Sequence, residues 1–367
     1  MLPLLHVENV TKRYGATTVL HDVDLRVADN EFLTILGPSG SGKTTILRII
    51  GGFESIDRGR LMFDGRDLAH VPINRRPFNT VFQDYALFHH MSVRKNVGYG
   101  LRVRGTPRQD IARRVAEVLA TVGLDEFGDR YPAQLSGGQR QRVALARAIV
   151  CEPRLILLDE PLAALDVNLR AQMQRFLKDL QRRLGIAFVF ITHDQEEAIV
   201  LSDRIVVVRD GRVEQDGTPH EVYHRPRTSF VANFLGENNL IDGKVSGVDG
   251  GMVRVETPLG MFAGTASGPV SVGRPVLLAV RPEHIAAAPG GANEIAGTVT
   301  DIRFLGPTAT LDVSPTTAPR LTIKLRQLGG AVAMAPGERV TVSWSPADTA
   351  VIAQGPTEPG RAGSAPP

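Results

Sequence analysis

A glycine-rich loop near the N-terminus constrains the fold of this chain more than any other feature. Residues 37–45 read "GPSGSGKTT" and match the pattern G-x-x-x-x-G-K-[ST]. The apolar run "EFLTILG" enters this loop as a predicted strand, and residues 46–51 leave it as a predicted helix. A glycine-rich surface loop is the plain alternative, but the flanking strand and helix favour a loop that cradles phosphate groups.

Within this loop the motif assigns a role to each side chain that carries chemistry. Lys43 neutralises phosphate charge, and the Thr44 hydroxyl binds Mg²⁺. The backbone around them is expected to surround the phosphates, and the predicted phosphate-binding residues are Gly37, Pro38, Ser39, Gly40, Ser41, Gly42, Lys43, Thr44 and Thr45. The motif therefore predicts a nucleotide site at the start of a helix.

Two later apolar runs, "PRLILLDE" (153–160) and "IAFVFITHD" (186–194), have the composition of buried parallel strands. The residues between them place leucines at helical spacing from Leu169 to Leu184, and Gly185 ends this amphipathic pattern. Strand, helix and strand in this order predict a doubly wound α/β core, in which ligands bind at the carboxyl ends of the strands.

Polar side chains follow these predicted strands. Asp159 is placed to hold Mg²⁺ through water, and Glu160 is placed to orient or deprotonate an attacking water. His193 could polarise a phosphate, Gln83 could contact Mg²⁺ or the water, and Tyr14 could stack on a base. Each has a plain alternative as a solvated strand end, a structural histidine or an exposed tyrosine, and only the preceding phosphate loop favours chemistry.

A second glycine loop opens another helix at "LSGGQRQRVALARAIVC" (135–151). Apolar residues from Val143 to Ile149 recur at roughly helical spacing, so a phosphate could also bind at this helix start. One nucleotide does not need two such loops from a single site, and the residues alone do not tell whose phosphate the second loop contacts.

The remaining sequence predicts the domain organisation. Residues 4–36 are β-rich, "GRLMFDGRDL" (59–68) reads as a hairpin, and the stretch at about 84–152 is helical, with one helical face running from Ile111 to Val122 before Gly123. After residue 236 short β-like runs predict a small barrel. We therefore expect a nucleotide-binding domain at 1–236, an all-β domain at 237–353 and a disordered tail at 354–367.

Composition narrows the class. The chain has 367 residues, one cysteine and a formal charge of +3, so it predicts a globular protein without a disulfide framework. Basic residues are scattered among acids, which gives weak support for nucleic-acid binding, and no partner of that kind is expected. The sequence shows neither an export signal nor a stretch long and apolar enough to span a membrane, which predicts a soluble protein.

Taken in order, "KRYG", "GPSGSGKTT", "VFQDYALF", "LSGGQRQR", "LILLDEPLAALD" and "FITHD" resemble the ATP-binding subunits of ABC transporters across residues 1–235. The resemblance implies a P-loop NTPase core with an antiparallel β subdomain and a helical subdomain, followed by an all-β, OB-like domain. It also implies a homodimer in which the second glycine loop covers the ATP of the opposite chain.

The same resemblance implies residue roles. The catalytic residues would be Glu160 as general base, His193 as sensor of the γ-phosphate, and Gln83, which also links the nucleotide to the membrane subunits. Mg²⁺ would contact Thr44, Gln83 and Asp159. Besides the phosphate loop, ATP would contact Tyr14, Ser136, Gly137, Gly138, Gln139 and Asp166. Ala163 departs from the serine common in the family, which puts cross-talk between the two sites in question.

The segments "DYALFHHMSVRKNVGYGLR" and "EVYHRPRTSFVANFLGENNLIDGKV" resemble the importer subgroup with a C-terminal β-barrel, although His89 stands where most relatives have proline. "FLGENN" is most similar to the spermidine/putrescine type. This implies peripheral attachment to the cytoplasmic face of the inner membrane, on two membrane-spanning permease subunits served by a solute-binding protein. Ferric iron, phosphonate, sulfate or sugar importers are alternatives.

Other classes remain open at this stage. A soluble ABC ATPase acting on nucleic acid or ribosomes would usually carry coiled-coil inserts or two tandem nucleotide domains, which this chain lacks. A non-hydrolysing nucleotide-dependent scaffold would not need Glu160 and His193, and a P-loop kinase or GTPase would not explain LSGGQ. For the β-rich part, dimer stabilisation and binding of a regulatory ligand or protein both remain possible, with dimerisation favoured.

Overall fold

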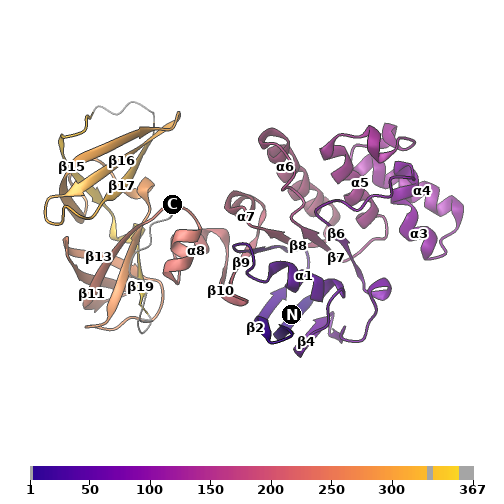
Figure 1. Ribbon diagram of the computed structural model, residues 1–367, viewed down its shortest axis with the longest axis horizontal. Helices are drawn as coiled ribbons and strands as arrows, with labels where there is room; N and C mark the ends of the chain where they lie inside the picture. The colour runs from indigo at the N-terminus through magenta and orange to yellow at the C-terminus, as the bar shows by residue number, and fades with distance from the viewer. Residues whose placement is uncertain (1–2, 329–333, 355–367) are drawn as a thin grey trace. The chain divides into compact units, whose positions relative to one another are not determined.

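The structure, a computed structural model, describes residues 3–328 and 334–354. The chain divides into two compact units, Met1–Pro219 and His220–Pro367 (Figure 1). This division falls before residue 236, where the sequence placed the domain boundary, so the last helices of the predicted nucleotide-binding domain group with the second unit. Of the predicted tail, residues 355–367 lie outside the described part of the chain.

Two sheets form the centre of the first unit. A mixed sheet has the strand order β10-β9-β3-β8-β7-β6, in which β10 alone is antiparallel to its neighbour. Its strands are β3 (Phe32–Leu36), β6 (Phe78–Val81), β7 (Leu155–Asp159), β8 (Ala187–Thr192), β9 (Arg204–Arg209) and β10 (Arg212–Gly217). The antiparallel sheet β2-β1-β4-β5 consists of β1 (Leu5–Tyr14), β2 (Thr17–Val27), β4 (Arg58–Phe63) and β5 (Arg66–Asp67).

Helices of the first unit cover the mixed sheet, and those between β6 and β7 form the expected helical region (Figure 1). The helices are α1 (Lys43–Gly51), α2 (Val93–Val97), α3 (Tyr99–Val103), α4 (Arg108–Thr121), α5 (Gly137–Ile149), α6 (Val167–Leu184) and α7 (Gln195–Leu201), with 3₁₀ turns at Ile73–Arg75, Asp125–Phe127 and Pro132–Gln134. The predicted α/β core with parallel strands at 153–160 and 186–194 is therefore confirmed.

Local turn chemistry explains where several of these elements end. Asp64 and Gly65 have φ values of 50° and 73°, as a two-residue hairpin turn requires, and they join β4 to β5 as the sequence predicts. Gly185 ends α6 at φ 61°, a left-handed conformation that a residue without Cβ adopts at low cost.

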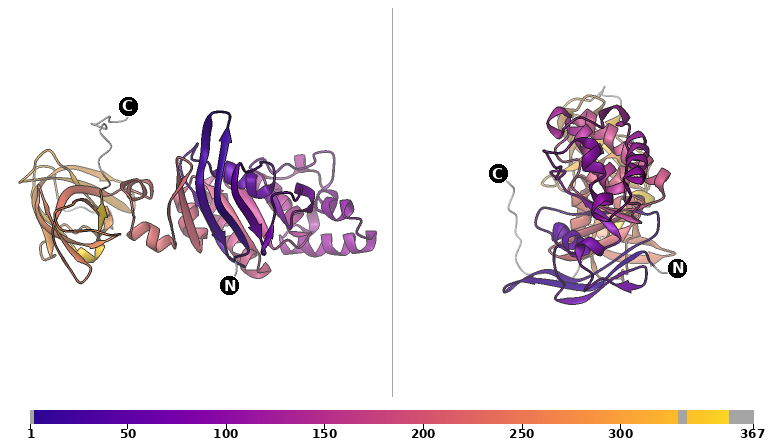
Figure 2. Two further views of the ribbon diagram at one scale, coloured as in Figure 1. Left: turned by 90° about the horizontal axis from the view of Figure 1, so that it is seen from below. Right: turned by 90° about the vertical axis from the view of Figure 1, so that its right-hand side faces the viewer.

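Burial joins these layers. One core lies between the mixed sheet, α6 and the helical region, and includes Phe32, Phe188 and Phe190, all fully buried. A second core lies between the two sheets and around α1, with Leu33, Ile35 and Leu47 among its members. Figure 2 shows β1 and β2 as a long twisted pair over this second core. The packing fixes the carboxyl ends of the parallel strands relative to α1.

The second unit is all-β after two short helices, α8 (Pro219–His224) and α9 (Ser229–Phe234). Five of its strands form a closed barrel in the order β11-β12-β13-β19-β14, and the other four form a sheet in the order β17-β16-β15-β18. These strands are β11 (Asn239–Asp249), β12 (Met252–Thr257), β13 (Gly260–Ala266), β14 (Pro275–Val280), β15 (Asn293–Phe304), β16 (Thr308–Pro315), β17 (Ile323–Leu328), β18 (Arg339–Trp344) and β19 (Thr349–Ala353), with 3₁₀ turns at Pro282–His284 and Pro346–Asp348.

The expected all-β barrel is confirmed, and the additional four-stranded sheet is a feature that the sequence did not predict. One core connects the two sheets: the Phe262 ring of the barrel lies 5.2 Å from the Trp344 ring of β18, measured between centroids. Trp344 is 3% exposed. The barrel and the sheet therefore form one folded body, because each covers apolar side chains of the other.

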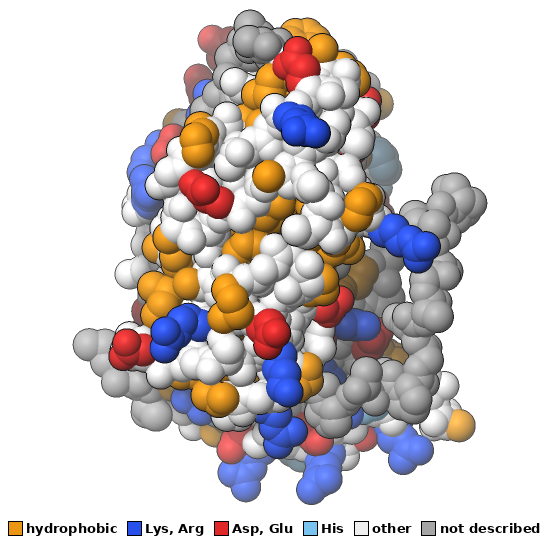
Figure 3. All heavy atoms as spheres, turned by 90° about the vertical axis from the view of Figure 1, so that its left-hand side faces the viewer, with side chains coloured by type: hydrophobic (Ala, Val, Ile, Leu, Met, Phe, Trp, Pro, Cys, Tyr) orange, Lys and Arg blue, Asp and Glu red, His pale blue; other side chains and the backbone are white. Residues whose placement is uncertain are grey.

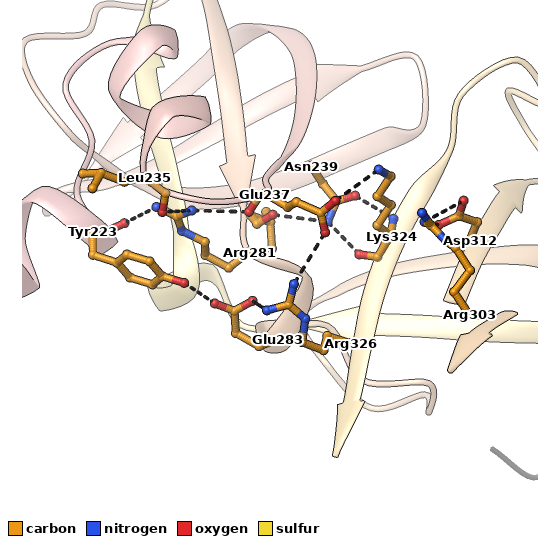
Figure 4. A network of polar contacts seen from close by, with 11 residues as sticks. Tyr223, Leu235, Glu237, Asn239, Arg281, Glu283, Arg303, Asp312, Lys324 and Arg326 are labelled. Atoms are coloured by element: carbon orange, nitrogen blue, oxygen red, sulfur yellow. Dashed lines mark hydrogen bonds and ion pairs between the residues drawn. The ribbon is translucent and has the colours of Figure 1, made fainter. Parts of the chain in front are cut away.

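A polar network attaches the α8–α9 segment to this body (Figure 4). The Arg281 guanidinium is buried and donates to the backbone oxygens of Leu235, Glu237 and Tyr223 at 2.9, 3.3 and 2.9 Å. The Tyr223 hydroxyl donates to Glu283 Oε1 at 2.6 Å. Since buried carbonyl groups need hydrogen-bond donors, these bonds explain why the segment after residue 219 folds with the β-rich unit.

The surface of the second unit carries scattered apolar side chains. On the face shown in Figure 3 they are dispersed among backbone atoms and other side chains, with a few charged groups between them. Phe304 and Leu305, at the turn between β15 and β16, are 69% and 57% exposed. Among the described residues, no helix is long and apolar enough to cross a membrane.

Candidate functional site

The order of strands in the mixed sheet brings the predicted site residues to one edge. The phosphate loop follows β3, His193 follows β8, Asp159 and Glu160 come at the end of β7, and Gln83 follows β6. These strands are parallel neighbours in the sequence β3-β8-β7-β6, so their carboxyl ends meet at the same edge. The first requirement of a shared site is therefore met by topology.

The phosphate loop joins β3 to α1 with glycines where side chains do not fit. A Cβ on Gly37 would lie 2.2 Å from the Val208 carbonyl oxygen, and Gly42 has φ 100° at the N-cap of α1. The loop is also held from outside, because the Gly211 N–H in the β9–β10 turn donates to the Ser41 carbonyl oxygen at 3.0 Å. The loop is therefore fixed in a shape that leaves backbone N–H groups at a helix start.

Lys43 occupies the centre of this loop. Its Nζ donates to the carbonyl oxygens of Gly37 and Pro38, both at 2.8 Å. Burial lowers the pKa of the Lys43 ammonium, while Glu160 and Asp159 oppose that shift. The Ser41 hydroxyl is buried in the same loop and has no hydrogen-bond partner among the residues that the structure describes. A cation and an unpaired hydroxyl in a glycine loop provide donors for phosphate oxygens.

The residues next to this loop fit a bound Mg²⁺. Thr44 lies exposed in the first turn of α1, and the partly buried Asp159 ends β7. Burial, followed by the neighbouring Glu160, raises the pKa of the Asp159 carboxyl, and a divalent cation would relieve both effects. A hydroxyl and a carboxylate are oxygen ligands of the kind that Mg²⁺ prefers. In the described part of the chain, no cluster of three or more His, Cys, Asp and Glu side chains could hold a metal.

Glu160 and His193 are in direct contact. His193 Nδ1 lies 3.2 Å from Glu160 Oε2, and the two side chains are 56% and 22% exposed. Glu160 has φ 43°, a conformation that is costly for a residue with a Cβ, and its N–H donates to the Ile191 carbonyl oxygen at 3.0 Å. A strained carboxylate held against a histidine at a ligand-binding edge is an arrangement suited to proton transfer.

Gln83 follows β6 at this edge of the mixed sheet, and Tyr14 ends β1 in the antiparallel sheet. Gln83 is exposed after β6, and the loop that follows it is fixed by Arg147, whose guanidinium donates to the backbone oxygens of Tyr85 and Ala86 at 2.8 and 2.7 Å. Tyr14, at the end of β1, is 43% exposed, with Lys12 Nζ 5.1 Å from its ring centroid. Between these two side chains and the phosphate loop, the described residues show no hydrogen bond.

The second glycine loop begins α5, as the sequence predicts. Ser136 is the N-cap: its hydroxyl accepts from the Gln139 N–H at 3.3 Å, and the Gln139 side chain accepts from the Ser136 N–H at 2.9 Å. Gly138 packs so closely on Leu169 that a Cβ would lie 3.0 Å from it. Figure 1 shows α5 in the helical region and α1 in a different part of the unit.

Asp166 is the N-cap of α6. Its carboxylate accepts from the Leu169 N–H at 2.9 Å, and the residue is exposed. Sequence reasoning missed a polar cluster next to this loop and beside His193, which consists of the buried Thr192 and Glu197 and the partly buried Arg170 and Asp194. Asp194 and Glu197 have the spacing of a helix N-cap and its third residue, which was the one available signal.

Together the strand–loop–helix phosphate loop, the carboxylates at the end of β7 and the histidine after β8 define a P-loop nucleotide-binding site. Comparison with known proteins specifies the family. The ABC transporter family model matches residues 20–163, and the TOBE domain model matches residues 278–352.

The spermidine/putrescine import ATP-binding protein PotA of Rubrobacter xylanophilus is 46% identical over 343 residues, which cover 93% of this chain and 91% of that protein. PotA of Escherichia coli strain K12 is 57% identical over 243 residues, 66% of this chain and 64% of that protein. A solved structure of cbiO1 from Clostridium perfringens, part of the ABC transporter complex cbiONQ, has a TM-score of 0.56 and 31% identity over 60% of this chain and 91% of that one.

This chain belongs to the family of ABC transporter ATP-binding proteins, with a C-terminal TOBE domain. It is accordingly an ATP-binding subunit of a transporter and an ATPase, and the predicted family, fold class and enzyme class are confirmed. The domain boundaries, the roles of individual site residues, Mg²⁺ and the oligomeric state stay predictions.

Proposed function

We propose that this protein is the MgATP-dependent, homodimeric energy-coupling subunit of a polyamine importer, bound to the cytoplasmic face of the inner membrane on two permease subunits. The single observation that carries the catalytic part is the meeting of the phosphate loop, Asp159, Glu160 and His193 at one sheet edge. The substrate class rests on the names of the relatives, spermidine/putrescine import proteins that match most of this chain.

In this proposal each residue of the edge has one task. Lys43 and the loop N–H groups bind the β- and γ-phosphates of ATP, and Thr44 and Asp159 hold Mg²⁺, which neutralises the phosphate charge during hydrolysis. Glu160 accepts the proton of the attacking water. His193, held by Glu160 at 3.2 Å, donates a hydrogen bond to the γ-phosphate. Gln83 orients the water or contacts Mg²⁺.

Dimerisation supplies the second phosphate contact. Ser136, Gly137, Gly138 and Gln139 would cover the nucleotide bound by the opposite chain, and Asp166 would contact the seam between the chains. The proposal is supported by the exposed position of Ser136 and Asp166 at helix starts. ATP bound by both chains favours the closed dimer, and ADP does not, so hydrolysis reopens it.

A groove beside the Gln83 loop supports docking of the permease subunits. It has a volume of about 440 Å³, and its walls include Phe88, Tyr99, Val103 and Arg147. Tyr99 and Val103 are 37% and 68% exposed, so this groove offers apolar surface to a partner. Arg147 lines the groove and also holds the loop after Gln83. A partner that contacts Arg147 would therefore be connected to the nucleotide edge through this loop.

Glu160→Gln tests the proposed mechanism. Loss of a general base typically lowers the rate by about 10²–10⁴-fold, so this variant should bind ATP, remain dimeric with ATP and barely release phosphate. Phosphate release and light scattering with and without ATP measure the two effects, and Glu152→Gln, on an exposed turn, serves as the matched control. Near-normal hydrolysis by Glu160→Gln, or a permanently monomeric ATP-bound protein, would contradict the proposal.

Transport assays decide the cargo. Reconstituted with the permease subunits and the solute-binding protein of its own importer, the complex should take up spermidine or putrescine with hydrolysis of ATP. Uptake of ferric iron, phosphonate, sulfate or sugar instead would keep the ATPase role and change the substrate. ATP hydrolysis stimulated by nucleic acid or ribosomes, and not by the permease, would favour a soluble ABC ATPase.

A further inference from the structure

A partly buried polar cluster of Arg170, Thr192, Asp194 and Glu197 lies beside His193, and the proposed mechanism does not use it. Glu197, in the first turn of α7, is 3% exposed, and its Oε2 accepts a hydrogen bond from the Thr192 hydroxyl at 2.7 Å. The Thr192 hydroxyl in turn accepts from the Asp194 N–H at 3.0 Å, and the Asp194 carboxylate accepts from the Glu197 N–H at 3.1 Å. The residues on both sides of His193 are therefore fixed by one set of bonds.

Arg170 connects this cluster to a different loop. Its guanidinium donates to Asp194 Oδ2 at 3.3 Å and to the Leu165 carbonyl oxygen at 3.2 Å. The Arg170 Nε lies 3.7 Å from Glu197 Oε1 and is buried without a hydrogen-bond partner. One side chain thus contacts the loop that ends at Asp166 and the turn that carries His193.

The same groups surround a small cavity that reaches the proposed catalytic pair. Its volume is about 80 Å³, and its lining residues are Glu160, Ala163, Arg170, Thr192, His193, Asp194 and Glu197. The cavity is therefore lined by both the Glu160–His193 contact and the Arg170 guanidinium, so a shift of the guanidinium would change the space beside this pair. The contacts of Arg170 with the two loops provide a physical connection between them.

We propose that Arg170 is a positioning residue that ties the Leu165–Asp166 loop to the orientation of His193 against the γ-phosphate. The inference rests on the proposed roles of Glu160 and His193. When the opposite chain contacts Asp166, the displacement of this loop passes through the Leu165 carbonyl and the Arg170 guanidinium to Asp194, and the turn carrying His193 follows. Hydrolysis then depends on dimer closure at a residue that touches neither nucleotide nor water.

The geometry requires a forked side chain. A guanidinium binds the Leu165 carbonyl and the Asp194 carboxylate with separate nitrogens, whereas a lysine ammonium is a single centre that satisfies the carboxylate at the expense of the carbonyl. Arg170→Lys should therefore keep the charge beside Glu197 and weaken the link between the loops.

The test compares Arg170→Met with Arg175→Met, an exposed position on the same helix. We expect Arg170→Met to lower kcat for ATP by about 10- to 100-fold, because a misplaced catalytic group costs about that much, while KM and ATP affinity change less than about three-fold. Arg170→Lys should be intermediate in kcat, and Arg175→Met should resemble the wild type. A kcat of Arg170→Met within two-fold of Arg175→Met would overturn the inference.

A second variant separates positioning from folding. Arg170→Met leaves the buried Glu197 without its cation, whereas Arg170→Met/Glu197→Gln removes both charges together. If the double variant melts like the wild type and binds ATP normally but has the lowered kcat, the inference holds. If Arg170→Met loses ATP affinity and melting temperature together and the double variant restores full kcat, the role is structural and the inference is wrong.

Glu160→Gln distinguishes this failure from failure of the proposed function. Normal hydrolysis by Glu160→Gln would show that Glu160 and His193 are not the catalytic pair. The proposed function of these residues and the inference about Arg170 would then both be rejected. An inactive Glu160→Gln beside a fully active Arg170→Met would leave the proposed function intact and reject only the coupling through Arg170.

Discussion

The sheet edge of the first unit and the Arg281 network of the second unit differ in how their polar groups are paired. In the first unit, the sheet edge holds a Ser41 hydroxyl without a partner, an Asp159 carboxyl with a raised pKa and Glu160 at φ 43°. In the second unit, the buried Arg281 donates hydrogen bonds to three backbone oxygens, and the Asn239 side chain bonds to the backbone of Val280 and Lys324. At the sheet edge the unpaired hydroxyl and the strain are features that a bound ligand could relieve, whereas the Arg281 and Asn239 bonds hold segments of the second unit in place.

The largest loss of stability is expected from a substitution in the core of the second unit. Trp344→Ala empties the contact with Phe262 between barrel and sheet and should destabilise this unit by about 3–5 kcal/mol. Calorimetry of the full chain should show one transition lowered and the other unchanged, with ATP hydrolysis retained. Trp344→Phe is the control, since it keeps a ring and removes an N–H that has no partner in the structure. Loss of ATP hydrolysis in step with unfolding would show that the units are not independent.

A smaller effect is expected when the polar network is opened. Arg281→Met leaves the backbone oxygens of Leu235, Glu237 and Tyr223 without their donor, which should cost about 2–4 kcal/mol in the second unit. Trp344 is the only tryptophan of the chain, so its fluorescence during urea unfolding reports this unit selectively. Arg274→Met, at an exposed position, should change stability by less than about 0.5 kcal/mol. Equal stability of the two variants would contradict a structural role for the network.

The smallest effect concerns pH. Burial, then the neighbouring His220, His284 and Arg281, lower the pKa of His224 from its ordinary value of 6.5, and Asp348 opposes them. Because the unfolded chain binds the proton more readily, the second unit should lose stability as pH falls below about 6.5, by no more than about 0.5 kcal/mol at this partly exposed group. Urea titrations followed by Trp344 fluorescence at pH 7.5 and about 5.5 measure the loss. His224→Gln should reduce it, and an unchanged loss would assign it to other groups.

Sequence predicted best what is encoded locally. The phosphate loop, the helix start at the second glycine loop and the end of α6 at Gly185 follow from short motifs whose geometry does not depend on distant contacts. The edge position of Glu160 and His193 could also be anticipated, because parallel strands present their carboxyl ends together. The 3.2 Å contact between these side chains and the positive φ of Glu160 could not, since both depend on how β7 and β8 pair.

The sequence did not reveal the hydrogen-bonded polar pairs whose members lie far apart in the chain. Arg170 and Asp194 are 24 residues apart and resemble ordinary surface charges until α6 and α7 pack together. For the same reason the sequence did not reveal that Arg281 and Glu283 bind Tyr223 of α8, so that α8 and α9 group with the β-rich unit; the domain boundary at residue 236 stays a prediction. Short β-like runs likewise did not reveal that some would close a barrel and others would form a separate sheet.

The hydrogen bond from Gly211 to the Ser41 carbonyl gives strand β10 an importance beyond pairing. β10 begins directly after Gly211 and pairs with β9 as far as Gly217, with a register shift between Val213 and Gln215, so a short segment connects the turn that contacts the phosphate loop to the end of the first unit. In the proposed site, a displacement of β10 along β9 would therefore reach the loop assigned to the phosphates through this hydrogen bond. A shortened or lengthened β10 should consequently alter nucleotide release more than the hydrolytic step.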